Sequence, residues 1–100
     1  LKEGMTGGEG DAIARNYLEA HGLGKLFTHS LGHGIGLKIH EFPSLRQGGT
    51  EVLKEKMVFS DEPGVYLAGS FGIRIEDTVT ILSGRAKTFM KKVSKELTIL

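Results

Sequence analysis

The stretch Gly72–Leu82, GIRIEDTVTIL, alternates apolar and polar residues more regularly than any other part of the chain. An alternation with a period of two is typical of a β-strand with one buried face. The residues that follow, Ser83-Gly84-Arg85, predict a turn into a second strand over 86–90, and therefore a β-hairpin. The apolar positions are Ile73, Ile75, Val79 and Ile81, and the polar ones are Arg74, Glu76, Thr78 and Thr80.

A helix is predicted near the start of the chain, over residues 7–21. Thr6 and Glu9 have the spacing of a capping box, in which each side chain accepts a hydrogen bond from the other residue's backbone N–H. Apolar residues then recur at three- and four-residue intervals, and Gly22 supplies a residue suited to end the helix.

Shorter strands are predicted between this helix and the hairpin, over residues 35–42, 57–60 and 65–67. Residues 43–50 and 51–56 are interpreted as a loop and a polar connector, because they contain Pro43, Gly48 and Gly49 followed by charged residues. A short helix is expected over 93–97. The sum is an α+β chain with mostly antiparallel strands.

Composition excludes several classes of function. The chain has 100 residues, enough for one domain or a part of one, and 13 Lys and Arg balance 12 Asp and Glu. This near-neutral charge argues against nucleic acid or an anionic membrane as a partner. The absence of cysteine excludes disulfides, thiolate metal sites and a cysteine nucleophile, and it leads us to expect a reducing compartment, the cytoplasm. No apolar run approaches the roughly 20 residues of a membrane helix.

Histidines provide the first candidate chemistry. His29 and His33 are four residues apart, but Ser30 follows the first, and Gly32 and Gly34 flank the second, so a zinc-binding helix is not expected. Glycines on both sides of His33 would let bare backbone hold its imidazole at close range, which suits a metal ligand. The alternative is a histidine that only makes hydrogen bonds or lies at the surface.

Two glutamates are candidate co-ligands. Glu62 precedes Pro63-Gly64, and Glu76 lies on the polar face of the 72–82 strand, where Arg74 shares its side. Asp61 and Asp77 neighbour them but would face the other way. Without a metal, these glutamates would be an ordinary turn residue and a solvated charge.

At this point the residues resemble a known family. Phe27–Gly36, FTHSLGHGIG, followed by His40-Glu41 and Pro43, is similar to the signature of the pita-bread metallopeptidases, which include methionine aminopeptidase, prolidase and Xaa-Pro aminopeptidase. Downstream, Met57-Val58-Phe59, Glu62–Tyr66 and Gly72–Asp77 resemble the Xaa-Pro branch. The similarity extends from Leu1 to about Leu97.

The resemblance implies a fold and an activity. The chain, residues 1–100, would be the C-terminal part of the catalytic domain, a mostly antiparallel sheet with a helix packed on one face. The activity would be metal-dependent hydrolysis of the peptide bond preceding proline, with a proline-containing peptide as substrate. The family commonly forms homodimers, so a second copy is a possible partner.

The resemblance also implies roles for individual residues. His33, Glu62 and Glu76 match ligands of a site for two divalent ions, for which Mn, Co, Zn and Fe are all suitable. His29 and His40 match histidines that contact the substrate and stabilise the reacting carbonyl. Arg74 matches an arginine that braces the site, and Glu62 would also move the proton.

One departure from the family is large. Its site needs two further aspartates from an upstream strand, and Asp11, Asp61 and Asp77 do not match them. We therefore expect three of five metal ligands here, an upstream half that completes the domain, and an isolated chain that binds metal weakly and is inactive.

Two rival interpretations stay open. One is a metal-free C–N hydrolase similar to creatinase, and the other is a non-catalytic peptide-binding module on the same fold. The presence of His33, Glu62 and Glu76 together favours the metallopeptidase. The sequence does not separate a dipeptidase from an aminopeptidase.

Overall fold

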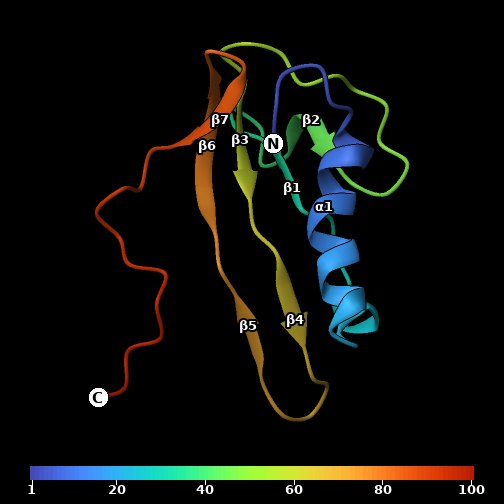
Figure 1. Ribbon diagram of the computed structural model, residues 1–100, viewed down its shortest axis with the longest axis vertical. Coiled ribbons are helices and arrows are strands. Elements are labelled where there is room, and N and C mark those ends of the chain that lie inside the picture. The colour runs from blue at the N-terminus through green and yellow to red at the C-terminus, as the bar shows by residue number, and fades with distance from the viewer.

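Two antiparallel sheets and one helix make up the computed structural model, which describes residues 1–100 (Figure 1). Five strands form the larger sheet in the order β2-β1-β3-β6-β7, and β4 pairs with β5 below it. No helix is long and apolar enough to cross a membrane. In chain order the elements are α1 (Gly7–Ala20), the 3₁₀ turn η1 (Gly24–Leu26), β1 (Gly32–Gly34), β2 (Glu41–Leu45), β3 (Val58–Asp61), β4 (Gly64–Tyr66), β5 (Gly72–Arg74), β6 (Asp77–Leu82) and β7 (Arg85–Thr88). The α+β class and the mostly antiparallel sheet with one helix are as expected.

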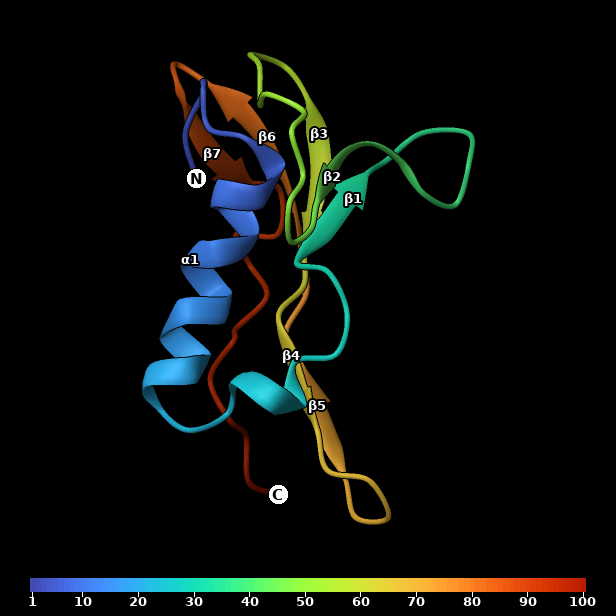
Figure 2. The ribbon, with the colours of Figure 1, turned by 90° about the vertical axis from the view of Figure 1, so that its right-hand side faces the viewer.

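Helix α1 begins where the capping box predicts. The backbone N–H of Glu9 donates to Thr6 Oγ1 at 3.1 Å, and the N–H of Thr6 donates to Glu9 Oε2 at 2.8 Å. The helix ends at Ala20, and Gly22 has the positive φ of 73° that favours glycine. Ala14 and Leu18 pack on the core. Figure 2 shows α1 on one face of the sheet and the β1–β2 connection projecting from the other.

The core lies between α1 and the sheet. Phe59 and Ile81 are completely buried on neighbouring strands, and Val79 lies beside them. Leu45 of β2 and three residues of the connecting segments complete the cluster. The buried apolar residues are Phe27, Leu31, Leu45, Leu53, Phe59, Val79 and Ile81.

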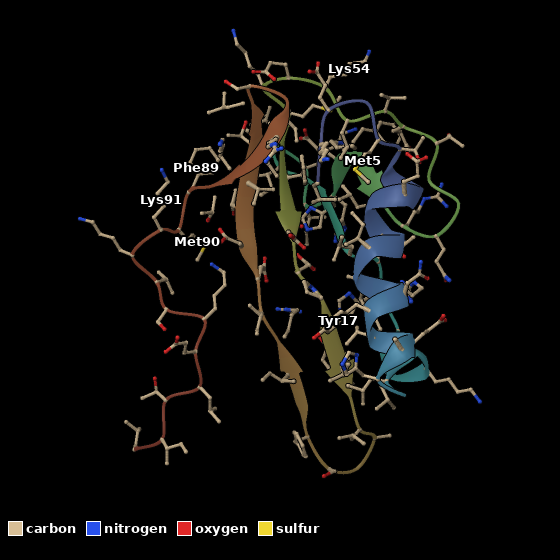
Figure 3. All side chains as sticks on the ribbon, viewed as in Figure 1. Met5, Tyr17, Lys54, Phe89, Met90 and Lys91 are labelled. Atoms are coloured by element: carbon tan, nitrogen blue, oxygen red, sulfur yellow. The ribbon has the colours of Figure 1, made fainter.

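A second apolar region lies lower on the molecule. The lower half of α1 and the β4–β5 hairpin enclose an open hollow of about 380 Å³. Tyr17, labelled in Figure 3, lines it together with Val65 and Ile73. Its side chain is 65% exposed, so this part of the helix packs less tightly than the part above the core.

The strand expected over 35–42 is wrong. Ile35, Leu37 and Ile39 alternate as in a strand, but residues 35–40 form the connection between antiparallel β1 and β2, and all three side chains are exposed. The loop expected over 43–50 is also partly wrong, because β2 includes Pro43. Proline is tolerated there because β2 is an edge strand and its register with β1 shifts at a bulge.

The strand predicted over 72–82 is interrupted. It comprises β5 and β6, separated by Ile75 and Glu76. The hairpin after it is confirmed, with Leu82 opposite Arg85 and positive φ angles of 54° and 79° at Ser83 and Gly84. The helix expected over 93–97 is wrong, since the chain after Thr88 contains no helix.

Gly32 illustrates how closely the strands approach one another. A Cβ atom at this position would lie 1.8 Å from the backbone oxygen of Ser60 on β3. We expect Gly32→Ala to lower the free energy of unfolding by about 2–3 kcal/mol, the upper range for overpacking, as measured by urea denaturation. Gly36→Ala is the control, because the atoms nearest to its Cβ would all belong to the movable carboxylate of Glu41. Equal stability of the two variants would contradict this packing.

Candidate functional site

The two glutamates lie where two long strands are interrupted. Asp61 pairs with Asp77 at the end of the β3–β6 ladder, and Gly64 pairs with Arg74 at the start of the β4–β5 ladder. Both ladders have the same register, and the N–H of Ile75 donates to the carbonyl of Pro63 between them at 3.2 Å. Glu62 and Glu76 are therefore directly opposite each other. Like charges at such a position destabilise a sheet unless a cation lies between them.

His33 reaches the same region from the neighbouring strand β1. Its Nε2 lies 3.6 Å from Glu62 Oε2, and its Nδ1 lies 2.9 Å from the carbonyl oxygen of Gly34. A carbonyl only accepts hydrogen bonds, so Nδ1 carries the proton and the lone pair of neutral His33 is on Nε2. This tautomer directs a ligating nitrogen toward Glu62. Ser60 Oγ on β3 accepts a hydrogen bond from the backbone N–H of His33 at 3.1 Å, which holds β1 against β3 at this point.

An open hollow of about 790 Å³ lies beside His33. His40 enters it from the β1–β2 connection, and the two imidazole rings meet edge to face with centroids 4.6 Å apart. Polar or charged residues form most of the lining of the hollow, which is large enough for a short peptide. Its walls are Ser30, His33, Lys38, His40, Glu41, Phe42 and Ser44.

Glu76 stands apart from this hollow. Its Oε2 lies 3.4 Å from Arg74 Nε, in an ion pair whose side chains are about half exposed, so the pair contributes little stability. No group of three or more His, Asp or Glu side chains is close enough to hold a metal ion. The structure thus brings His33 together with Glu62 and His40, and it pairs Glu76 with Arg74. Glu62 and Glu76 lie opposite each other because the two strand pairs have the same register.

His29 belongs to a neighbouring cluster. Its Nδ1 donates to the carbonyl of Ser30 at 2.7 Å, which leaves Nε2 to accept from the hydroxyl of Tyr66 at 3.2 Å. The sequence analysis gives Tyr66 no role of its own, although it ends the Glu62–Tyr66 segment that resembles the Xaa-Pro branch. Nothing in the sequence alone brings it to His29.

Asp61 and Asp77 face away from the glutamates, as alternation predicts. Asp77 accepts hydrogen bonds from Lys95 at 2.7 Å and from Thr88, and these bonds hold the pKa of Asp77 below its ordinary value of 3.8. Burial raises the pKa of Asp61, and the nearby charge of Asp77 adds to that rise. Asp77 therefore anchors the C-terminal segment through Lys95, and both aspartates lie on the other side of the strands from the candidate site.

Comparison with known proteins identifies relatives of the whole chain. A model of metallopeptidase family M24 matches residues 1–83. The Xaa-Pro dipeptidase of Pyrococcus furiosus is 50% identical over 96% of this chain and 27% of its own length. The chain spans about a quarter of the length of the relatives it matches.

Solved structures of Xaa-Pro peptidases have the same fold over the matched segment. The Xaa-Pro dipeptidase from Bacillus anthracis superposes with a TM-score of 0.93 at 45% identity, covering 100% of this chain and 28% of that one. The X-prolyl aminopeptidase from Caenorhabditis elegans, described as a cytosolic enzyme with a di-nuclear active site, superposes with a TM-score of 0.70 at 31% identity. It is matched over 88% of this chain and 16% of its own. The fold of this chain is that of the corresponding prolidase segment.

Proposed function

The chain belongs to metallopeptidase family M24, and from that membership we propose that it forms the C-terminal part of the catalytic domain of a Xaa-Pro peptidase. The proposed reaction is hydrolysis of the peptide bond that precedes proline. The observation that carries the proposal is the position of Glu62, which lies next to His33 Nε2 and opposite Glu76. An imidazole and two carboxylates are ligands of the kind that Mn, Co, Zn or Fe accepts.

His33, Glu62 and Glu76 would hold the metal ions from this side. When bound, two divalent ions would lower the pKa of a water molecule and polarise the substrate carbonyl. Two aspartates from an upstream half would supply the remaining ligands. One imidazole and two carboxylates carry too little negative charge to hold two divalent cations close together.

The other residues have roles that their positions support. Glu62 would take up the proton of the attacking water on a carboxylate oxygen and pass it to the leaving amine. His40, which lines the hollow with His33, would donate a hydrogen bond to the carbonyl oxygen as it gains charge. His29, whose Nε2 accepts from the Tyr66 hydroxyl, would contact the substrate beside it. Arg74 would orient Glu76 through their ion pair.

Joining this chain to an upstream half tests the proposal. The complete protein should contain two metal ions and hydrolyse a Xaa-Pro dipeptide or a Xaa-Pro tripeptide, and the preferred length would separate a dipeptidase from an aminopeptidase. Without cysteine, such an enzyme suits the reducing cytoplasm. A complete protein that binds metal but cleaves neither substrate would contradict the proposal, and metal-free cleavage of another C–N bond would favour the creatinase-like alternative.

The isolated 100-residue chain provides a further prediction. It should bind Mn²⁺ only weakly and show no turnover of a Xaa-Pro dipeptide, because it contributes three of the five proposed ligands. Calorimetry and an amine-release assay would measure both. Clear turnover by the isolated chain would show that the upstream ligands are not needed.

A further inference from the structure

A buried ion pair lies on the inner face of α1, away from the candidate site. Asp11 is completely buried, and the side chain of Arg15, one helical turn later, is 12% exposed. The guanidinium makes two hydrogen bonds to the carboxylate, Nε to Oδ2 at 2.7 Å and Nη2 to Oδ1 at 3.1 Å. This paired geometry fixes both side chains in one orientation.

The pair also holds the backbone that leads from η1 into β1. Arg15 Nη1 donates to the carbonyl of Phe27 and Nη2 to the carbonyl of His29, both at 2.9 Å. Asp11 Oδ1 accepts the N–H of Leu31 at 3.0 Å. The three backbone groups come from alternate residues, so the ion pair bonds this segment as a neighbouring strand would. The guanidinium also lies over the ring of Phe27, 4.2 Å from its centroid.

The held segment connects directly to the candidate site. His29 is one of the residues whose carbonyl Arg15 binds. Leu31, whose N–H Asp11 binds, accepts the backbone N–H of Glu62 with its own carbonyl at 2.8 Å. Two hydrogen bonds and one residue therefore link α1 to Glu62. Two residues beyond Leu31 lies His33.

Stability alone does not account for this pair. Burying two charges requires removing their water, and apolar side chains of similar volume often give equal or greater stability in the same place. Such side chains would fill the space but could not bind two carbonyls and an N–H. The ion pair therefore does more than fill space, because it fixes the position of the backbone of residues 27–31.

We propose that Asp11 and Arg15 are positioning residues that set the placement of His29 and Glu62 around His33. This inference rests on the function proposed above. Displacement of a catalytic group by about 1 Å is enough to lower turnover by roughly 100-fold.

The test compares variants of the complete protein that separate stability from position. Asp11→Leu/Arg15→Met replaces the pair with apolar side chains, and Arg15→Lys keeps the charge but loses the planar fork. Arg85→Met is the matched control, since Arg85 is exposed and its side chain has no hydrogen-bond partner. Three backbone groups lose their partners in the double variant, so we expect it to unfold at a lower temperature. Assayed per folded molecule, it should still lose about 10- to 100-fold in kcat with little change in KM. Arg15→Lys should lose kcat in the same direction, and Arg85→Met should match the wild type.

A second readout does not depend on activity. Amide hydrogen exchange at Leu31 and Glu62 should be at least about tenfold faster in the double variant and in Arg15→Lys, and unchanged in Arg85→Met. Wild-type protein that cleaves no Xaa-Pro substrate would refute the proposed function, while the exchange data would still decide the positioning role. Wild-type kcat and exchange rates in either pair variant would overturn the inference. A loss of kcat that is fully explained by the smaller amount of folded protein would also overturn it. If the double variant does not fold, the kcat and exchange rates of Arg15→Lys decide the positioning role.

Discussion

Replacing Glu62 by glutamine in the complete enzyme should lower kcat for a Xaa-Pro dipeptide by at least about 100-fold, the range expected when a proton-transferring group is lost. Glutamine keeps the size of the side chain and an oxygen that can face His33, but it cannot take up a proton at neutral pH. Substrate binding should change little, because the backbone and the hollow beside His33 are unaltered. The measurement is steady-state kinetics at saturating metal, with metal content determined alongside.

Glu19→Gln is the matched control for this variant. Glu19 is exposed on α1, and its side chain makes no hydrogen bond or ion pair, so the same chemical change should leave kcat unaltered there. Unchanged turnover in Glu62→Gln, with metal bound, would remove Glu62 from proton transfer.

Replacing His33 by alanine should weaken metal binding by more than about 100-fold, since even groups that only support a metal ligand are worth about 10- to 100-fold in affinity. The loss removes Nε2, the nitrogen that the Nδ1–Gly34 hydrogen bond leaves free for a metal ion. Competition with a fluorescent chelator would measure the affinity of the complete enzyme.

His21→Ala provides the comparison for the His33 variant. His21 follows α1 and is exposed, and its Nδ1 bonds only the carbonyl of Tyr17. Its replacement should leave metal affinity as in the wild type. Equal affinities in the two variants would mean that His33 is not a ligand.

Local sequence patterns predict the parts of this fold that local interactions decide. The helix follows from the Thr6–Glu9 capping box and the spacing of its apolar residues, and the Ser83-Gly84 turn follows from its residue types. The strands around the site cannot be predicted from local patterns in this way. Residues 35–40 have a strand-like alternation, but the partner strand β2 lies beyond them, so the chain must turn there. The break at Ile75 and Glu76 depends on a partner segment containing Pro63, which no local pattern includes.

Sequence patterns propose residues for the candidate site, but they do not give its geometry. Sequence indicates His33 through its flanking glycines and Glu62 through the Pro-Gly that follows it. The pairing of Glu76 with Arg74 follows from the strand face that they share, but the distance of Glu76 from His33 depends on side-chain positions. The ion pair of Asp11 and Arg15 has a visible signal, opposite charges one helical turn apart. Its burial, and its bonds to a segment more than ten residues away, appear only in the folded chain.

The proposed metal site depends most on one property, that His33, Glu62 and Glu76 face a common cation. Paramagnetic broadening tests it in the 100-residue chain even when binding is weak. Small amounts of Mn²⁺ would be added to the folded, isotope-labelled chain, and side-chain resonances would be followed by NMR. We predict that resonances of these three residues broaden first and together. Broadening that begins at Asp61 and Asp77 instead, with His33 and Glu76 unaffected, would contradict a shared cation at these residues.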